Sequence, residues 1–91
     1  MGDGGNALGL NRVTLNVMGE DYIVTGNDTV EYIENIGRYL NEKIEEINKA
    51  TGGGKLSKVQ LAILAALQVA DEYYKLRQEH EELLQLIKEA K

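Results

Sequence analysis

The chain has no cysteine, proline, tryptophan or phenylalanine, and only one serine and one histidine. Without cysteine it has neither a disulfide framework nor a thiolate metal site to reinforce a small core. A reducing compartment is compatible with this composition. A chain of 91 residues encloses little interior for its surface, so contacts with a partner are one way to complete the core. The composition favours a single small domain and makes self-association an early hypothesis.

The residues that catalysis and metal binding require are also scarce. Ser57 and His80 stand 23 residues apart on one predicted helix, about 35 Å at the helical rise, so they cannot form a triad within one subunit. One histidine without cysteine gives no zinc-ligand spacing. Residues 52–57 (GGGKLS) are similar to a phosphate loop, but Lys49 occupies the place of its first glycine and Leu56 the place of its Ser or Thr. We therefore expect no catalytic site, cofactor or metal, and no enzyme.

Positive charge is in short supply as well. Fifteen acidic and ten basic side chains give a net charge of −5, which argues against general binding to nucleic acid or anionic lipid. The longest mostly apolar stretch, residues 59–70, is shorter than the roughly 20 residues of a membrane span. We expect no nucleic-acid partner and no membrane insertion. Residues 1–10, with four glycines, are expected to be a disordered tail.

Two β-strands are predicted near the start. Residues 13–17 alternate apolar and polar side chains, and residues 22–25 supply a second strand. Gly19, Glu20 and Asp21 fit a short hairpin connection. Because an isolated hairpin is only marginally stable, another element must cover its apolar face.

A first helix follows, to about residue 50. Asp28 with Glu31 has the spacing of a capping box. An apolar stripe suited to covering the hairpin consists of Val30, Ile33, Ile36 or Gly37, Leu40, Ile44 and Ile47. Gly37 indicates either the close approach of another backbone or a tolerated imperfection.

The glycines at 52–54 predict the end of that helix, and a second begins at once. Ser57 and Gln60 form another capping box, and Leu56 with Leu61 has the spacing of a hydrophobic staple. With no later proline or glycine, this helix can run to the end of the chain, about 35 residues or 50 Å. A face with Leu61, Leu64 and Leu67 is expected to pack on the first helix and the hairpin.

The second helix also carries the a/d seam of a coiled coil, with residues alternately four and three apart. We refer to it below as the seam; it consists of Ala62, Ala66, Val69, Tyr73, Leu76, His80, Leu83 and Ile87, and Ala90 continues it. The first helix is too short to cover it, so we expect the same helix of a second subunit to do so. The alternative is a helix folded back in a monomeric bundle. His80 either specifies the register, acts as a pH switch, or sits at a tolerant edge of the interface, the interpretation we favour.

The hairpin sequence RVTLNVMGEDYIV and the segment LAALQVADE at residues 64–72 resemble the ZapA family, whose members cross-link FtsZ filaments at the bacterial division site. The resemblance covers residues 12 to about 88. It implies a parallel dimer with two heads and a protruding coiled coil, through which longer members pair into antiparallel tetramers. Because the tail is shorter here, we expect a dimer, with a tetramer left open.

The resemblance also implies the partner and the residues that contact it. In the family the head binds FtsZ, and basic residues near the loop between the helices are implicated; here Lys49, Lys55 and Lys58 occupy that region, unless they are ordinary solvated charges. Gln68 matches an asparagine of the family, and Glu20 stands where some relatives carry arginine. The implied location is the cytoplasm, at the division site.

The sequence thus predicts an α+β fold: a tail at 1–10, a head at 11–55 that combines the hairpin and the first helix, and a dimerisation helix at 56–91 that continues the head core. The leading functional hypothesis is a filament cross-linker. The alternative is a generic dimerisation adaptor or a regulator that binds another protein through its head. An enzyme is a distant third, because no nucleophile, base and orienting group converge in the pattern.

Overall fold

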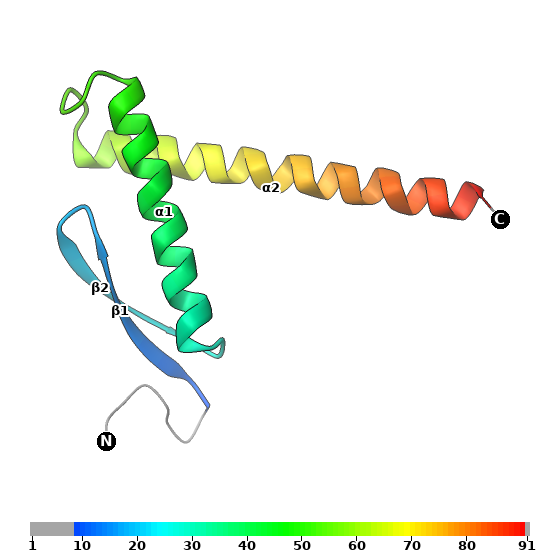
Figure 1. Cartoon of the computed structure of the whole chain (residues 1–91), viewed down its shortest axis with the longest axis horizontal. Coiled ribbons are helices and arrows are strands. Elements are labelled where there is room, and N and C mark those ends of the chain that lie inside the picture. The colour runs from blue at the N-terminus through cyan, green and yellow to red at the C-terminus, as the bar shows by residue number, and fades with distance from the viewer. Residues whose placement is uncertain (1–8, 91) are drawn as a thin grey trace.

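The computed structural model describes residues 9–90, so most of the predicted tail, residues 1–8, lies outside the described part. The elements are β1 (Asn11–Val17), β2 (Glu20–Gly26), α1 (Val30–Ala50) and α2 (Lys58–Glu89). Figure 1 shows the hairpin and α1 side by side, while α2 crosses α1 and continues well beyond it. The α+β class predicted from the sequence is confirmed.

The hairpin is tighter than the sequence suggested. Val17 pairs with Glu20, so the connection is only Met18 and Gly19, with φ of 52° and 85°. Positive φ at both central residues is the geometry that matches the twist of the two strands. Met18 adopts it despite its side chain, and that side chain packs against the core cluster. The predicted three-residue connection was therefore too long: Glu20 and Asp21 belong to β2.

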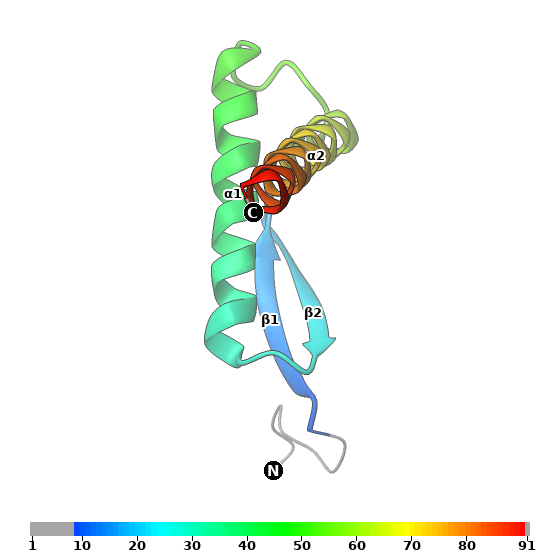
Figure 2. The same cartoon turned by 90° about the vertical axis from the view of Figure 1, so that its right-hand side faces the viewer.

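The hairpin is covered along one strand only. Val13 and Val17 of β1 are buried, whereas β2 is exposed except at Gly26. In Figure 2, β1 lies between α1 and β2. Leu15 of β1 sits over Gly37, where an added Cβ would lie 2.9 Å from a Leu15 methyl carbon. The close approach predicted at Gly37 is therefore made by a side chain and not by a backbone.

The start of α1 differs from the prediction by one residue. The cap is Thr29, whose Oγ1 accepts a hydrogen bond of 3.0 Å from the Tyr32 amide, so the Asp28 capping box was wrong. The Asp28 carbonyl instead accepts a hydrogen bond from Asn11 Nδ2. Of the predicted stripe, Ile33, Gly37 and Ile44 are buried, Leu40 and Ile47 are half-buried, and Val30 and Ile36 are exposed. The helix therefore turns Gly37, and not Ile36, toward the strands.

The helix reversal follows the prediction. Gly52, Gly53 and Gly54 all have positive φ, which costs glycine little. The Ser57 hydroxyl accepts a hydrogen bond from the Gln60 amide, and the Gln60 side chain accepts one from the Ser57 amide. Both halves of the second capping box are thus present, and they define where α2 begins.

The core lies where α1 crosses α2 above the tip of the hairpin. It consists of Val17, Ile44, Leu61 and Ala65, with Leu15, Met18, Leu40, Ile47 and Leu56 packed around it. Leu64 and Leu67 stay exposed, so the predicted packing face was wrong beyond Leu61. The face that turns to α1 runs instead through Leu61, Ala65, Gln68 and Glu72. The molecule is only 16 Å thick, and none of its described large side chains is fully buried.

Candidate interaction surfaces

The seam of α2 is uncovered along its whole length. All eight of its residues are exposed, and so is every described residue of the chain after Glu72. Tyr73 is 56% exposed and Leu76 is 66% exposed, fractions that are unusual for large apolar side chains repeated in one row. The helix is not folded back, so the monomeric bundle considered above is not the observed arrangement (Figure 1).

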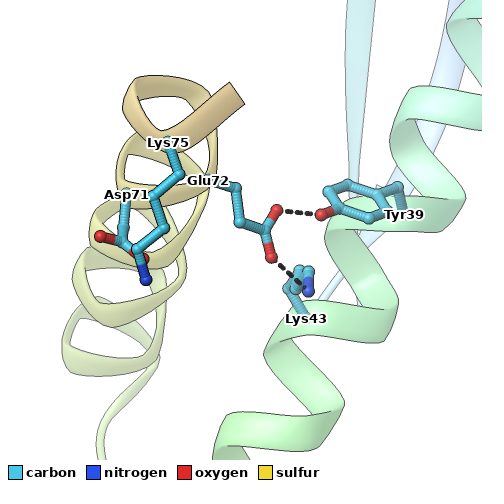
Figure 3. Close-up of polar contacts among 5 residues, drawn as sticks. All are labelled: Tyr39, Lys43, Asp71, Glu72 and Lys75. Atoms are coloured by element: carbon cyan, nitrogen blue, oxygen red, sulfur yellow. Dashed lines mark hydrogen bonds and ion pairs between the residues drawn. The ribbon is translucent and has the colours of Figure 1, made fainter. Parts of the chain in front are cut away.

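At the edge of the seam, Glu72 ties α2 to α1. One of its carboxylate oxygens accepts a hydrogen bond from the Tyr39 hydroxyl, and the other lies 2.6 Å from Lys43 Nζ. Lys43 Nζ is also 5.0 Å from the centre of the Tyr39 ring. Figure 3 shows Glu72 reaching across to both α1 residues, whereas the neighbouring Asp71 pairs with Lys75 on its own helix. We call Tyr39, Lys43 and Glu72 the helix clamp.

The charges of the clamp support one another. The hydrogen bond from Lys43, with that from Tyr39, lowers the pKa of Glu72 below its ordinary value. The bond to Glu72 raises the pKa of Lys43, and the bond to Glu72 likewise raises the pKa of Tyr39. At neutral pH the cluster therefore holds a carboxylate, an ammonium and a neutral phenol, each in the form that its partners favour.

The three predicted contact lysines lie around the connection between the helices. Lys49 is in the last turn of α1, Lys55 is in the loop, and Lys58 is the first residue of α2. All three are exposed, and Lys49 lies 3.6 Å from the Glu45 carboxylate. They share one end of the head, but no contact joins one to another among the interactions of the described residues.

The other two predicted contact residues lie in different surroundings. Gln68 is half-buried on the α1-facing line of α2, so it is only partly available to a partner. Glu20 is exposed at the start of β2 and accepts a hydrogen bond of 2.9 Å from the Tyr22 hydroxyl, which raises the pKa of Tyr22. The tip of the hairpin points toward the start of α2 (Figure 1), so Glu20 lies at the same end of the head as the lysines.

Sequence reasoning missed a second exposed apolar area, which belongs to the head. It consists of Tyr22 and Val24 of β2 with Tyr32 and Ile36 of α1, and we call it the corner surface. One signal was available: Tyr32, Ile36 and Tyr39 repeat at spacings of four and three, a second stripe beside the buried one. Because the first helix was expected to cover the apolar face of the hairpin, the sequence did not predict an exposed apolar area there.

Two other kinds of site are absent from residues 9–90. No group of three or more His, Cys, Asp or Glu side chains is placed to hold a metal ion there. None of the helices in the same part of the chain has the length and apolar character to cross a membrane.

This fold and the seam define a class of protein: a small hairpin-and-helix head carried on a long helix with an unpaired coiled-coil face. The family profile described as "Cell division protein ZapA" matches residues 13–91. The chain belongs to the ZapA family, as its hairpin and its alanine-rich segment had indicated.

Individual relatives agree with this assignment. A cell division protein ZapA of Shouchella clausii is 34% identical over 70 residues, which cover 77% of this chain and 87% of that protein. One of Geobacillus sp. (strain WCH70) is 30% identical over 80 residues, with coverage of 88% and 90%. The solved structure described as "ZapA mutant dimer from Geobacillus stearothermophilus" superimposes with a TM-score of 0.69 at 29% identity, and covers 86% of this chain and 88% of that chain.

Proposed function

We propose that this chain is a non-enzymatic division protein that dimerises through the seam of α2 and cross-links FtsZ filaments through its two heads. In this role it promotes assembly of the FtsZ ring at the division site in the cytoplasm. The observation that carries the proposal is the exposed, mainly apolar seam on a helix that extends beyond the head. Membership of the ZapA family and the dimeric state of the solved relative support it.

Two heads on one coiled coil explain cross-linking without any new contact. Once one head is bound, the second is held at a high effective concentration near the same filament or its neighbour. A single head could occupy a filament but could not join two. Bundling should therefore depend on the seam, whereas filament binding should depend on the head.

Charge in the seam is the first test. Leu76→Lys and Leu83→Lys each place an ammonium in the proposed interface, and we expect a monomer at micromolar concentration by light scattering after size exclusion. Gln78→Lys, on the opposite side of the helix, is the matched control and should stay dimeric. If wild type itself is a monomer under these conditions, dimerisation through the seam is wrong.

Sedimentation with FtsZ tests the second half of the proposal. Low-speed pellets collect bundles, and high-speed pellets also collect single filaments. We expect the seam variants to appear only in the high-speed pellet and wild type in both. If wild type neither pellets with FtsZ nor raises filament light scattering, the cross-linking role fails, and an adaptor for another partner takes its place.

We further propose that Lys49, Lys55 and Lys58 meet the acidic surface of FtsZ, with Glu20 and the exposed part of Gln68 beside them. Lys55 and Lys58 carry the sharper test because Lys49 already pairs with Glu45. Lys55→Glu with Lys58→Glu should abolish co-sedimentation while the dimer persists. The charge-matched control, Lys75→Glu with Lys88→Glu, should pellet as wild type does. Equal pelleting of both double variants removes the lysines from the contact.

A further inference from the structure

A groove opens where the hairpin turn meets the two helices, near the start of α2 (Figure 1). Its volume is about 350 Å³, and we call it the turn groove; it is lined by Met18, Asn41, Ile44, Glu45, Asn48 and Leu61. Ile44 and Leu61 are buried residues of the core cluster, so the bottom of the groove is apolar. The volume is at the low end for a small-molecule site, and it suits a single side chain of a larger partner.

Met18 lines this groove in a strained backbone conformation. Its φ is 52°, which asparagine or glycine adopts more readily than a residue with a long side chain. Met18 is half-buried against the core cluster, so part of its thioether side chain remains accessible in the groove. Strained positions of this kind cluster at binding sites, and methionine adapts well to apolar partners. The turn thus retains an apolar contact residue where asparagine would relieve the strain.

Two carboxamide groups in the groove are held in place by the backbone. Asn41 Nδ2 donates a hydrogen bond of 2.9 Å to the Asn16 carbonyl, and Asn48 Oδ1 accepts one of 3.0 Å from the Gly54 amide. Within residues 9–90, neither the Asn41 side-chain oxygen nor the Asn48 side-chain nitrogen has a further partner. The groove therefore offers one fixed acceptor and one fixed donor beside its apolar bottom, which is the combination that a bound peptide segment requires.

The groove opens on the flank of α1 that faces away from the helix clamp. Tyr39 of the clamp and Asn41 of the groove lie on either side of Leu40, each about 100° around the helix from it. The clamp adjoins the seam through Glu72, so the seam and the groove belong to opposite flanks of α1. Pairing of two subunits along the seam therefore leaves the groove open.

We propose that the turn groove binds one apolar side chain from an acidic segment of FtsZ and so anchors the filament contact. The inference rests on the proposed function and deepens it. Charge complementarity selects this occupant. Lys49 pairs with Glu45 at the groove, and Lys55 and Lys58 are exposed at the same end of the head. A segment that reaches the groove therefore meets positive charge around it, while its apolar side chain supplies most of the affinity.

Substitutions of Met18 test the anchor. Met18→Asn removes the apolar side chain and suits the positive φ of the turn, so we expect its affinity for FtsZ filaments in co-sedimentation to fall by about tenfold. Met18→Leu keeps an apolar side chain and should stay within about threefold of wild type. Ile23→Asn is the matched control, because Ile23 is 60% exposed and lies on the outer face of the hairpin; it should bind as wild type does. Equal affinities for all four proteins overturn the inference.

Salt dependence distinguishes an apolar anchor from the lysines. Between about 50 mM and about 200 mM salt, the affinity of Met18→Asn should fall by the same factor as that of wild type, because screening acts on charges and not on an apolar contact. Lys55→Gln with Lys58→Gln removes two charges, so its affinity should fall by a smaller factor. If Met18→Asn loses its salt dependence together with its affinity, Met18 acts through the lysines and the anchor is wrong.

A measurement on the wild-type chain keeps the inference testable even if Met18→Asn fails to fold. The chain has two methionines, Met1 and Met18, and dilute hydrogen peroxide oxidises accessible methionine to the sulfoxide. Mass spectrometry of peptides follows each residue separately, with Met1 as the internal reference. Adding FtsZ filaments should slow the oxidation of Met18 relative to Met1 by about fivefold or more.

The outcomes separate this inference from the proposed function. If wild type pellets with FtsZ but the oxidation rate of Met18 is unchanged, the cross-linking role stands and the anchor fails. If Met18 becomes protected as the concentration of the protein itself rises, without FtsZ, a second copy covers the groove and the inference is again overturned. If wild type does not pellet with FtsZ at all, the proposed function is wrong and the anchor falls with it.

Discussion

At the scale of single residues, Glu72 determines how the long helix meets the head. Among the described residues it is the carboxylate of α2 that bonds to α1, and Tyr39 and Lys43 occupy both of its oxygens. Its neighbour Asp71 makes an ordinary pair with Lys75 on the exposed side of the same helix (Figure 3). Exposed pairs of that second kind contribute little to stability. The two adjacent acidic residues thus form a natural comparison.

We expect the clamp to give the protein a specific acid sensitivity. The pKa of Glu72 is lowered in the folded protein, so its contribution is fully present above the ordinary glutamate pKa, about 4.3, and is lost as the pH falls through the lower folded value. Glu72→Gln should therefore destabilise the protein at neutral pH, and the difference from wild type in urea unfolding should shrink as the pH falls below the ordinary glutamate pKa. Asp71→Asn should show neither effect. A pH-independent difference for Glu72→Gln would contradict this assignment.

Gly37 gives a second prediction, in which two effects oppose each other. Alanine there gains about 1 kcal/mol in helix propensity. Its Cβ would however lie 2.9 Å, 3.0 Å and 3.3 Å from three Leu15 side-chain carbons, and overpacking costs about 1–3 kcal/mol. We expect Gly37→Ala to lower the free energy of unfolding by about 1 kcal/mol. In a Leu15→Ala background the clash is removed and the same change should stabilise; urea unfolding at a fixed protein concentration measures both. Stabilisation in both backgrounds would show that Leu15 moves aside freely.

At the scale of elements, the two helix starts show what a sequence pattern can and cannot determine. Thr29→Ala should cost about 1 kcal/mol because it removes the oxygen that caps α1. Asp28→Ala should cost about 0.5 kcal/mol at most, the weaker effect of a charge near the helix end. Thermal unfolding of the two variants side by side measures the difference. The reverse ranking would restore the capping box predicted at Asp28.

Local signals predicted most of the fold, and tertiary geometry decided the rest. The capping box of Ser57 and Gln60 was unambiguous because Ser57 is the one good cap residue between Gly54 and the helix. At the first helix, Asp28 and Thr29 are both good cap residues, and the sequence does not show which of the two the hairpin places at the N-cap position. The seam was predicted from the alternating spacing of its apolar residues, and its exposure was predicted because the first helix is too short to cover the second. The packing face of α2 was not predicted correctly. Where α2 crosses α1, the small Ala65 is buried and the large Leu64 is exposed, and hydrophobic periodicity alone does not distinguish the two.

The corner surface was missed for the same reason. Tyr32 and Ile36 have helical spacing in the sequence, but whether a stripe is covered depends on where the hairpin lies. Likewise, the predicted FtsZ contacts came from the family resemblance. The structure adds that the three lysines are exposed and lie at one end of the head. Gln68 shows the limit: its half-buried position on α2 could not be read from a single sequence.

At the scale of the whole molecule, the second half of α2 is a helix without a tertiary partner among residues 9–90. Every described residue after Glu72 is exposed, and its side-chain bonds, such as Arg77 to Glu81 and Gln85 to Glu89, lie within the helix. Isolated helices near this length are marginal in water. The stability of this segment should therefore come from association, and folding of the second half of α2 should be coupled to dimer formation.

This coupling predicts a concentration-dependent protein. The thermal midpoint of wild type should rise with subunit concentration, since a tenfold increase shifts a dimer equilibrium by about 1.4 kcal/mol. In Leu83→Lys the midpoint should be independent of concentration, and amide hydrogens after Glu72 should exchange rapidly while those around Ile44 and Ala65 stay protected. Gln78→Lys should behave as wild type does. Slow exchange throughout α2 in a monomeric Leu83→Lys variant would mean that the helix is stable in the monomer. Its stability would then not come from dimer formation.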